Sequence, residues 1–220
     1  MLKYKGIIFD LDGVICHTDV FHYQAWKSLA DKLGIYFDEK INNRLRGVSR
    51  MESLEIVLER YKGKPMSNEE KITVADEKNE IYKSLLMQMD ESYLSDDVKT
   101  TLFKLRENGI KLAIGSSSKN ARLILDRIGL GSFFDAISDG NMIKHSKPHP
   151  EVFLLAADMI NLPPVKCLII EDARAGIEAA IAGGFDSVGM GDAKSDDRTT
   201  YRISEFSDIL PITSHLQPSQ

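Results

Sequence analysis

Two aspartates stand directly behind an apolar run near the start of the chain. Residues 7–9 are Ile, Ile and Phe, and Asp10 and Asp12 follow them, with Gly13 next. Residues of the β-branched and aromatic types, bounded by turn residues, are typical of a short buried strand. Asp10 then lies at the carboxyl end of that strand, where open parallel sheets bind ligands because the strand order reverses nearby. On an ordinary surface loop two such aspartates most often stabilise a solvent-exposed turn, so their function depends on the rest of the chain.

Three more polar groups fall at the ends of expected strands or just before expected helices. They are the three serines at 116–118, Lys147, and the pair Glu171 and Asp172. The carboxyl ends of parallel strands share one edge of a sheet, so we expect all of these groups to meet the first two aspartates there. Clustered carboxylates repel one another unless a cation joins them, and an all-oxygen set suits Mg²⁺ whose ligand shell a phosphate completes.

The combination of carboxylates, a lysine and serines predicts phosphoryl transfer. Lys147 suits a phosphoryl group as a point charge, and a serine behind a strand can donate to the same oxygens. An aspartate can itself attack phosphorus and form an aspartyl phosphate. Mg²⁺ and Lys147 would lower the barrier between the two anions by neutralising their charge. Asp12, two residues beyond Asp10, is placed to protonate the leaving oxygen or to deprotonate the acceptor.

The composition is that of an ordinary globular protein. The 220 residues are 43% hydrophobic and 28% charged, and the formal charge of −5 argues against nucleic acid as the main partner. Cys16 and Cys167 lie far apart and form no disulfide framework or metal-ligand spacing, which indicates a reducing compartment. We find no signal-peptide pattern and no apolar run long enough to span a bilayer. We therefore expect a cytoplasmic protein with no membrane partner.

The apolar periodicity divides the chain into two parts. After the first strand it is helical: apolar residues recur at every fourth position from Phe21 to Leu33, and Ser67 with Glu70 forms a capping box. From residue 95 onward helices alternate with strands, which implies parallel βαβ units. The later strands are expected at residues 111–114, 134–137, 167–170 and 186–190, the last of which ends the sheet. We expect an α/β core of residues 1–15 and 92–220, interrupted by an all-helical cap of residues 16–91.

The polar groups together resemble the haloacid dehalogenase superfamily of phosphotransferases. The motifs that carry the resemblance are Asp-Leu-Asp-Gly-Val at residues 10–14, the serine behind the second strand, Lys147, and Glu171 with Asp172. They span essentially the whole chain. The resemblance implies a Rossmann-like core whose parallel strands stand in the order 5-4-1-2-3, with the inserted helices as a type 1 cap that closes over the site.

The same resemblance implies a role for each carboxylate. Asp10 would be the nucleophile and Asp12 the acid and base. Mg²⁺ would be bound by Asp10, by the main-chain carbonyl of Asp12 and by Asp172, with Glu171 assisting.

Shorter stretches are similar to the β-phosphoglucomutase family within that superfamily. They are His22 with Trp26, residues 45–50, Lys78 with Asn79, and residues 116–120, which read Ser-Ser-Ser-Lys-Asn. The similarity implies that β-glucose 1-phosphate and β-glucose 6-phosphate are interconverted, with β-glucose 1,6-bisphosphate as intermediate and activator. It also implies that Arg50 binds the phosphate that is not being transferred. The implied sites are a substrate pocket of His22, Trp26, Gly47, Val48, Arg50, Ser53 and Lys78, a phosphate site of Ser116, Ser117, Asn120 and Lys147, and a hinge at Thr18.

Other interpretations stay open at this point. A sugar-phosphate or phosphoglycolate phosphatase would use the same chemistry until water attacks the aspartyl phosphate, and a non-catalytic sugar-phosphate-binding protein could retain the fold. Trp26 could pack in the core, His22 could fill an interface, Lys147 could be solvated, and Arg50 could form a surface ion pair. The two acidic residues at 171 and 172 could cap the next helix. We expect a small sugar phosphate as partner and a monomeric chain.

Overall fold

A six-stranded parallel sheet forms the centre of the structure. The computed structural model describes residues 3–46 and 48–213, and within them the strands stand in the order β3-β2-β1-β4-β5-β6. Every neighbouring pair of strands is parallel. The strands are β1 (Gly6–Phe9), β2 (Lys111–Gly115), β3 (Ala136–Ser138), β4 (Cys167–Glu171), β5 (Asp186–Gly189) and β6 (Tyr201–Arg202). The predicted order 5-4-1-2-3 is therefore confirmed for the first five strands.

The edge of the sheet carries one strand more than expected. β6 pairs with β5, Val188 lying opposite Tyr201 and Gly189 opposite Arg202. The expectation that residues 186–190 end the sheet is wrong. β6 has two residues, and no apolar pattern can be recognised over so short a segment.

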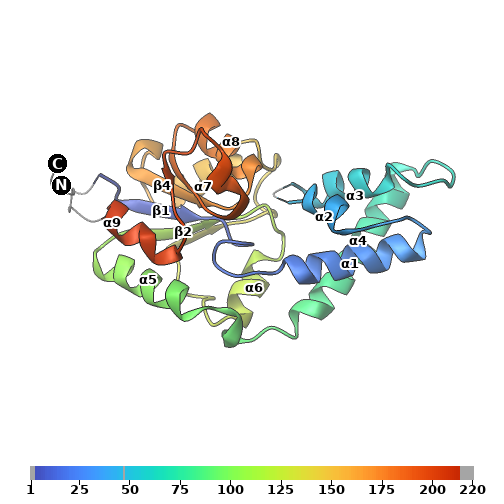
Figure 1. Cartoon of the computed structure of the whole chain (residues 1–220), viewed down its shortest axis with the longest axis horizontal. Helices are drawn as coiled ribbons and strands as arrows, with labels where there is room; N and C mark the ends of the chain where they lie inside the picture. The colour runs from blue at the N-terminus through green and yellow to red at the C-terminus, as the bar shows by residue number, and fades with distance from the viewer. Residues whose placement is uncertain (1–2, 47, 214–220) are drawn as a thin grey trace.

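Helices cover both faces of the sheet. They are α5 (Asp96–Glu107), α6 (Ala121–Arg127), α7 (Glu151–Met159), α8 (Arg174–Ala182) and α9 (Ile209–Thr213). Figure 1 shows α7 and α8 on one side of the sheet and α5 and α9 on the opposite side. Ile7 and Phe9 belong to the apolar cluster on one face, and Ile8 to the cluster on the other. Burial on both faces explains why the central strands are apolar throughout.

The pairing register aligns the strand ends that carry the predicted chemistry. In β1, Phe9 lies opposite Ile114 of β2 and Ile170 of β4. Asp10 therefore leaves the sheet beside Glu171, and its N–H group donates to the Ile170 carbonyl at 2.9 Å. The convergence that parallel strands predict at one edge of the sheet is present.

Four helices between β1 and α5 form a separate unit, which we call the cap. They are α1 (Asp19–Lys32), α2 (Glu39–Asn43), α3 (Arg50–Leu58) and α4 (Asn68–Leu86), and they lie to the right of the sheet in Figure 1. An apolar cluster that includes Trp26 and Leu54 holds them together. The capping box of Ser67 and Glu70 is confirmed at the start of α4. The domain boundaries at residues 16 and 91 stay a prediction.

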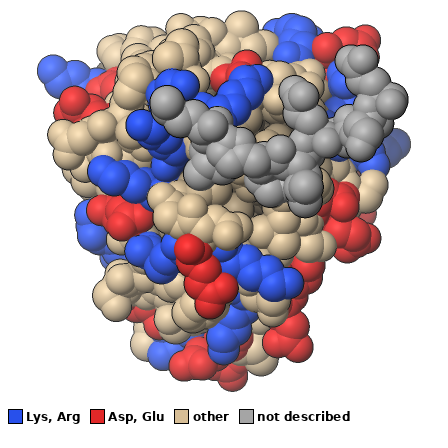
Figure 2. All heavy atoms as spheres, turned by 90° about the vertical axis from the view of Figure 1, so that its left-hand side faces the viewer, with Lys and Arg blue, Asp and Glu red and all other residues tan. Residues whose placement is uncertain are grey.

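Charges of both signs are interspersed on the face that Figure 2 displays. Within residues 3–46 and 48–213, no helix combines the length and the apolar character that crossing a membrane requires. Cys16 and Cys167 are both buried and unbridged, as their distant positions in the sequence indicated.

Candidate active site

A cavity of about 150 Å³ lies between the cap and the carboxyl edge of the sheet. It has room for several water molecules, so a ligand must displace water to bind there. The predicted site residues in its lining are Asp10, Asp12, His22, Trp26, Val48, Arg50, Ser53, Lys78, Ser116, Ser117, Asn120, Lys147, Glu171 and Asp172. Thr18 is buried beside this lining, in contact with Asp12. Gly47, also predicted, lies outside the described residues.

Lys147 links two buried carboxylates at the sheet edge. Its Nζ atom lies 2.5 Å from Asp10 Oδ1 and 2.5 Å from Glu171 Oε1. Because Lys147 is 1% exposed, it is not a solvated surface lysine. Burial lowers the pKa of Lys147, but Asp10 and Glu171 outweigh burial and raise it, so the ammonium stays charged. Glu171 Oε2 accepts the N–H groups of Asp172 and Ala173, both at 3.0 Å, which holds the carboxylate in place.

Asp10, Glu171 and Asp172 form a group of oxygen donors that fits a divalent cation. One ligand atom of each residue lies within 4.8 Å of the others, and all three residues are buried. With the Lys147 ammonium they carry a formal charge of −2, which a divalent cation neutralises. Burial raises the pKa of both Glu171 and Asp172, and Asp10 raises both further, while Lys147 opposes the rise at Glu171. A further cation would favour the charged form of both carboxylates. A buried set made only of carboxylate oxygens suits Mg²⁺.

Asp12 lies in a tight loop, and its side chain is turned to another partner. The Thr18 hydroxyl donates to Asp12 Oδ1. Burial raises the pKa of Asp12 to about 7, Asp10 adds to the rise, and the Thr18 hydrogen bond opposes it. The loop requires Gly13, which has a φ of 91° and at which a Cβ atom would meet the Asp172 carboxylate. Metal binding by the Asp12 carbonyl stays a prediction.

The loop behind β2 supplies polar groups to the cavity. Ser116 Oγ accepts the N–H group of Ser118 at 3.1 Å. Ser117 Oγ is buried and has no hydrogen-bond partner among the described residues. A buried hydroxyl without a partner costs about 1–3 kcal/mol, which a bound ligand can recover. Since Ser117 lines the cavity, it fits a ligand with acceptor oxygens, such as a phosphate.

Asn79 joins the cap to the core beside the cavity. Its Oδ1 atom accepts Arg50 Nη2 at 2.8 Å and Asn120 Nδ2 at 2.9 Å. Arg50 begins α3 and Asn79 belongs to α4, whereas Asn120 directly precedes α6 of the core. Arg50 Nη1 also lies 3.1 Å from Asp76, so the ion pair of the alternative interpretation exists. The Arg50 side chain is only 20% exposed and lines the cavity, so it is a partly buried cation and not an ordinary surface ion pair.

A lysine and a histidine meet on the cap side of the cavity. Lys78 Nζ lies 3.0 Å from His22 Nδ1, and it stands 4.9 Å from the centre of the Trp26 ring and 4.5 Å from that of Tyr82. Burial lowers the pKa of Lys78 to about 7, and Arg50 lowers it further. The pKa of His22 is lowered mainly by burial and then by Lys78, so His22 is neutral and can accept from Lys78. Trp26 packs in the apolar cluster of the cap and also lines the cavity, so it is both a core residue and part of the cavity wall.

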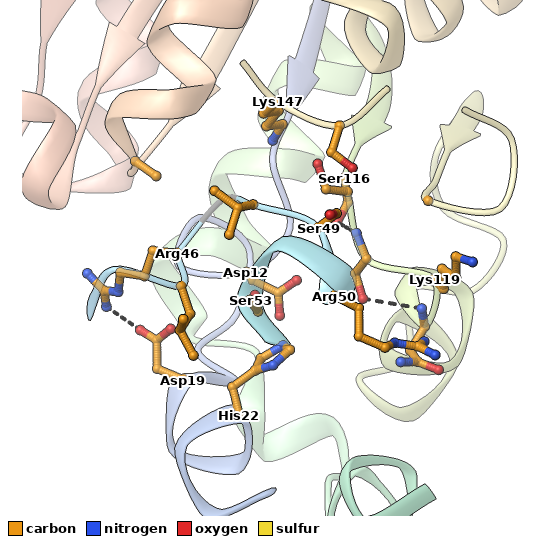
Figure 3. Close-up of a pocket in the computed structure, with 18 of the residues that line it drawn as sticks. Asp12, Asp19, His22, Arg46, Ser49, Arg50, Ser53, Ser116, Lys119 and Lys147 are labelled. Atoms are coloured by element: carbon orange, nitrogen blue, oxygen red, sulfur yellow. Dashed lines mark hydrogen bonds and ion pairs between the residues drawn. The ribbon is translucent and has the colours of Figure 1, made fainter. Parts of the chain in front are cut away.

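Several lining residues were not given a site role from the sequence, although Ser118, Asn79 and Lys119 lie in stretches that the sequence singled out. They are Asp19, Asn42, Leu45, Arg46, Ser49, Asn79, Tyr82, Ser118, Lys119, Gly140, Ser146 and Ala173. Lys119 and Asn79 belong to the stretches that resemble the β-phosphoglucomutase family, and this resemblance is the signal that could have assigned them to the site. Figure 3 shows Arg46 beside Asp19 on one side of the cavity and Arg50 on the other. No sequence signal pointed to the ion pair between Arg46 and Asp19.

The fold and the site define a class of phosphoryl-transfer enzymes in which a helical insert covers the acidic edge of a parallel sheet. The chain belongs to the haloacid dehalogenase-like hydrolase family, whose family model matches residues 4–184. The resemblance seen in the motifs is thereby confirmed.

Similar proteins include both a mutase and a phosphatase. The chain is 39% identical to the β-phosphoglucomutase of Bacillus subtilis over 193 residues, which are 85% of this chain and 83% of that protein. It is 32% identical to a fructose-1-phosphate phosphatase of Escherichia coli over 186 residues, 84% of this chain and 96% of that protein. A crystal structure of β-phosphoglucomutase from Clostridium difficile is 39% identical, covers 94% of this chain and 93% of its own, and superposes with a TM-score of 0.87.

Proposed function

We propose that this enzyme acts as a β-phosphoglucomutase, interconverting β-D-glucose 1-phosphate and β-D-glucose 6-phosphate. The observation that supports the proposal is that cationic and polar side chains line the cavity from both the core and the cap. Lys147 and the unpartnered Ser117 belong to the core, and Arg50 to the cap. A sugar with two phosphates, β-glucose 1,6-bisphosphate, can use both sets of side chains at once. The similarity to mutases from two bacteria supports this substrate.

The proposed reaction begins with attack by Asp10 on the phosphorus of the bisphosphate. A bond forms between an Asp10 oxygen and phosphorus, and the bond from phosphorus to the sugar oxygen breaks. The electron pair of that bond stays on the sugar oxygen, which takes a proton from Asp12. Lys147, 2.5 Å from Asp10, reduces the repulsion between the carboxylate and the phosphoryl group. A Mg²⁺ bound by Asp10, Asp172 and the Asp12 carbonyl, with help from Glu171, would supply further neutralising charge.

The second half of the reaction returns the phosphoryl group to the other end of the sugar. Asp12 takes the proton of the accepting hydroxyl, whose oxygen attacks phosphorus while Asp10 leaves. In the present structure the Asp12 carboxyl is engaged by Thr18, so it must exchange that hydroxyl for the sugar oxygen before it acts. We propose Thr18 as a hinge residue because it directly precedes the first cap helix, within a proposed cap of residues 16–91. A rotation there would move Thr18 and the cap together.

The cap residues around the sugar are proposed to fix its orientation. Lys78 can donate to a sugar hydroxyl while it is held by His22 at 3.0 Å, and Trp26 presents an apolar wall. Ser53, which follows Arg50 in α3, is 4% exposed and offers a hydroxyl to the cavity. A sugar phosphate phosphatase is the second candidate, because the Escherichia coli relative is a fructose-1-phosphate phosphatase. It would follow the same first step and then use water as acceptor.

The two candidates are separated by one assay. The enzyme is incubated with β-glucose 1-phosphate, Mg²⁺ and a trace of β-glucose 1,6-bisphosphate, while glucose 6-phosphate and free phosphate are followed in parallel. We expect glucose 6-phosphate to form faster than free phosphate, and rapid phosphate release with little isomer would establish the phosphatase instead. Asp10→Asn is expected to stop both products because it removes the nucleophile. Turnover that survives in this variant would contradict the covalent mechanism.

A further inference from the structure

Arg46 forms a connection between cap and core that the proposed chemistry does not use. It lies in the loop between α2 and α3, and its guanidinium pairs with Asp19, the first residue of α1. The same guanidinium reaches the core, where Nη1 lies 2.9 Å from Asp192 Oδ2. Asp192 belongs to the short helix η3 (Gly191–Ser195), which follows β5. A planar guanidinium can bind two carboxylates at once, which an ammonium does less well.

This connection lies at the wall of the active site. Arg46 lines the active-site cavity, and it also lines a second hollow together with Arg174 and Asp192. The helix that carries Asp192 is tied to the acidic cluster, because the N–H group of Ala193 donates to the Asp172 carbonyl at 2.8 Å. The Arg46 side chain, 31% exposed, therefore lies between the cavity and solvent. We call this contact of Arg46 with Asp19 of the cap and Asp192 of the core the seam.

Cap and core also meet through Asn79 and Asn120, whose amide groups lie 2.9 Å apart. That contact involves Asn120, which is proposed to bind phosphate, so Asn120 serves both the contact and the proposed phosphate site. The contact between Arg46 and Asp192 involves no residue of the proposed chemistry. It can hold its seam closed while the phosphate region is filled or emptied.

Electrostatics make Arg46 decisive for this seam. Asp19 on the cap side and Asp192 on the core side each offer a carboxylate, and both pair with the guanidinium of Arg46. With Arg46 present, the seam joins one cation to carboxylates on both sides. Without it, the remaining carboxylates repel one another across the seam.

We infer that Arg46 is a positioning residue that holds the cap on the core and thereby selects a sugar hydroxyl over water as acceptor of the phosphoryl group. This selection rests on the proposed function. In the competing reaction a water oxygen attacks the phosphorus of the aspartyl phosphate, the bond to Asp10 breaks, Asp12 takes the proton, and free phosphate leaves. Closing the seam reduces the access of water to that phosphorus.

The test compares Arg46→Gln with Arg44→Gln. Arg44 is a matched control, because it stands two residues away and pairs with Glu59 inside the cap, at 2.7 Å and 2.6 Å. The ratio of free phosphate to glucose 6-phosphate is measured for both variants and the wild type. We expect the ratio to rise in Arg46→Gln by about two- to fivefold for each ion pair lost, and to stay unchanged in Arg44→Gln. A merely structural role would lower both products equally, and that result, or an equal change in the control, overturns the inference.

A second variant tests whether Arg46 acts through Asp192. Asp192→Asn is expected to raise the same ratio by a smaller amount, and to add little when it is combined with Arg46→Gln. Fully additive effects would overturn the role given to this pair. Thermal unfolding shows whether each variant is folded, and if Arg46→Gln is not, Asp192→Asn carries the test, since the Asp192 side chain is 76% exposed.

A further measurement keeps the inference apart from the proposed function. If the wild type only releases phosphate, the mutase proposal fails, and the lifetime of the aspartyl phosphate formed from acetyl phosphate is compared instead. We expect this lifetime to be shorter in Arg46→Gln than in the wild type and in Arg44→Gln. Equal lifetimes in all three proteins overturn the inference whichever sugar phosphate the enzyme uses.

Discussion

Replacing Lys147 with methionine removes the ammonium that lies 2.5 Å from both Asp10 and Glu171. Methionine has a similar length and fills the space, so the change tests charge more than packing. Glu171 is 1% exposed and Asp10 is 8% exposed, so neither carboxylate can be solvated in place of its lost partner. The folded state is therefore left with uncompensated negative charge in its interior.

The expected size of the effect follows from this burial. Removing one partner of a buried ion pair costs about 3–5 kcal/mol. In a chain of this length each kcal/mol lowers the melting temperature by about 2–4 °C, so Lys147→Met is expected to melt about 6–20 °C below the wild type. Thermal unfolding is followed by circular dichroism in the presence of EDTA, so that no bound cation replaces the missing charge.

Two controls sharpen this prediction. Lys144→Met removes an exposed lysine three residues away and is expected to change stability by less than about 0.5 kcal/mol. Lys147→Met combined with Glu171→Gln is expected to recover part of the loss, because the stranded charge is removed as well. If Lys147→Met melts together with Lys144→Met, the buried ion pairs do not contribute as we infer.

Three further outcomes are expected. Arg50→Ala should lower kcat/KM for β-glucose 1-phosphate by about 10- to 150-fold, since a charged hydrogen bond contributes about 1.5–3 kcal/mol. The same variant should affect acetyl phosphate hydrolysis far less. Equal losses on both substrates would exclude binding of the second phosphate by Arg50. Burial lowers the pKa of Lys78 to about 7, so between about pH 7 and pH 10 the unfolded chain holds a proton that the folded chain has released, and stability rises with pH. The melting temperature of the wild type, relative to that of Lys78→Met, should therefore rise with pH across this range. A difference in melting temperature that does not change with pH would contradict a buried, neutral Lys78. Mg²⁺ at a hundredfold excess over its Kd should raise the free energy of unfolding by about 2.7 kcal/mol, and Asp172→Asn should lose most of this gain; an undiminished gain would exclude Asp172 as a ligand.

The strand ends at the active site could be predicted because their signal is local. A strand buried on both faces is a continuous apolar run, and the first polar residue after it marks the sheet edge. That reasoning placed Asp10 and Glu171 at the same edge of the sheet, and the strand order that the resemblance implies made them neighbours. The register of β1 against β4 confirms both. The capping box of Ser67 and Glu70 was equally readable, since both partners lie within one helical turn.

Contacts between the cap and the core could not be predicted in the same way. Asn79 and Asn120 are 41 positions apart, and Arg46 and Asp192 are 146 positions apart. No periodicity connects residues at such separations, because their meeting depends on how two separately packed units are joined. The resemblance singled out residues 45–50 as part of the candidate site, but it did not indicate which partner each side chain contacts.

The sequence by itself indicated the class of chemistry, because Asp10 and Asp12, Lys147, and the acidic pair at 171 and 172 each stand beside a strand or helix end that the local pattern reveals. Only the tertiary structure decided how these groups are charged and what surrounds them. The pKa of Lys78 falls to about 7, and Lys147 keeps its proton against burial, because desolvation and neighbouring charge depend on everything packed around a group. The ion pairs of Arg46 with Asp19 of the cap and Asp192 of the core likewise exist only once the cap rests on the core.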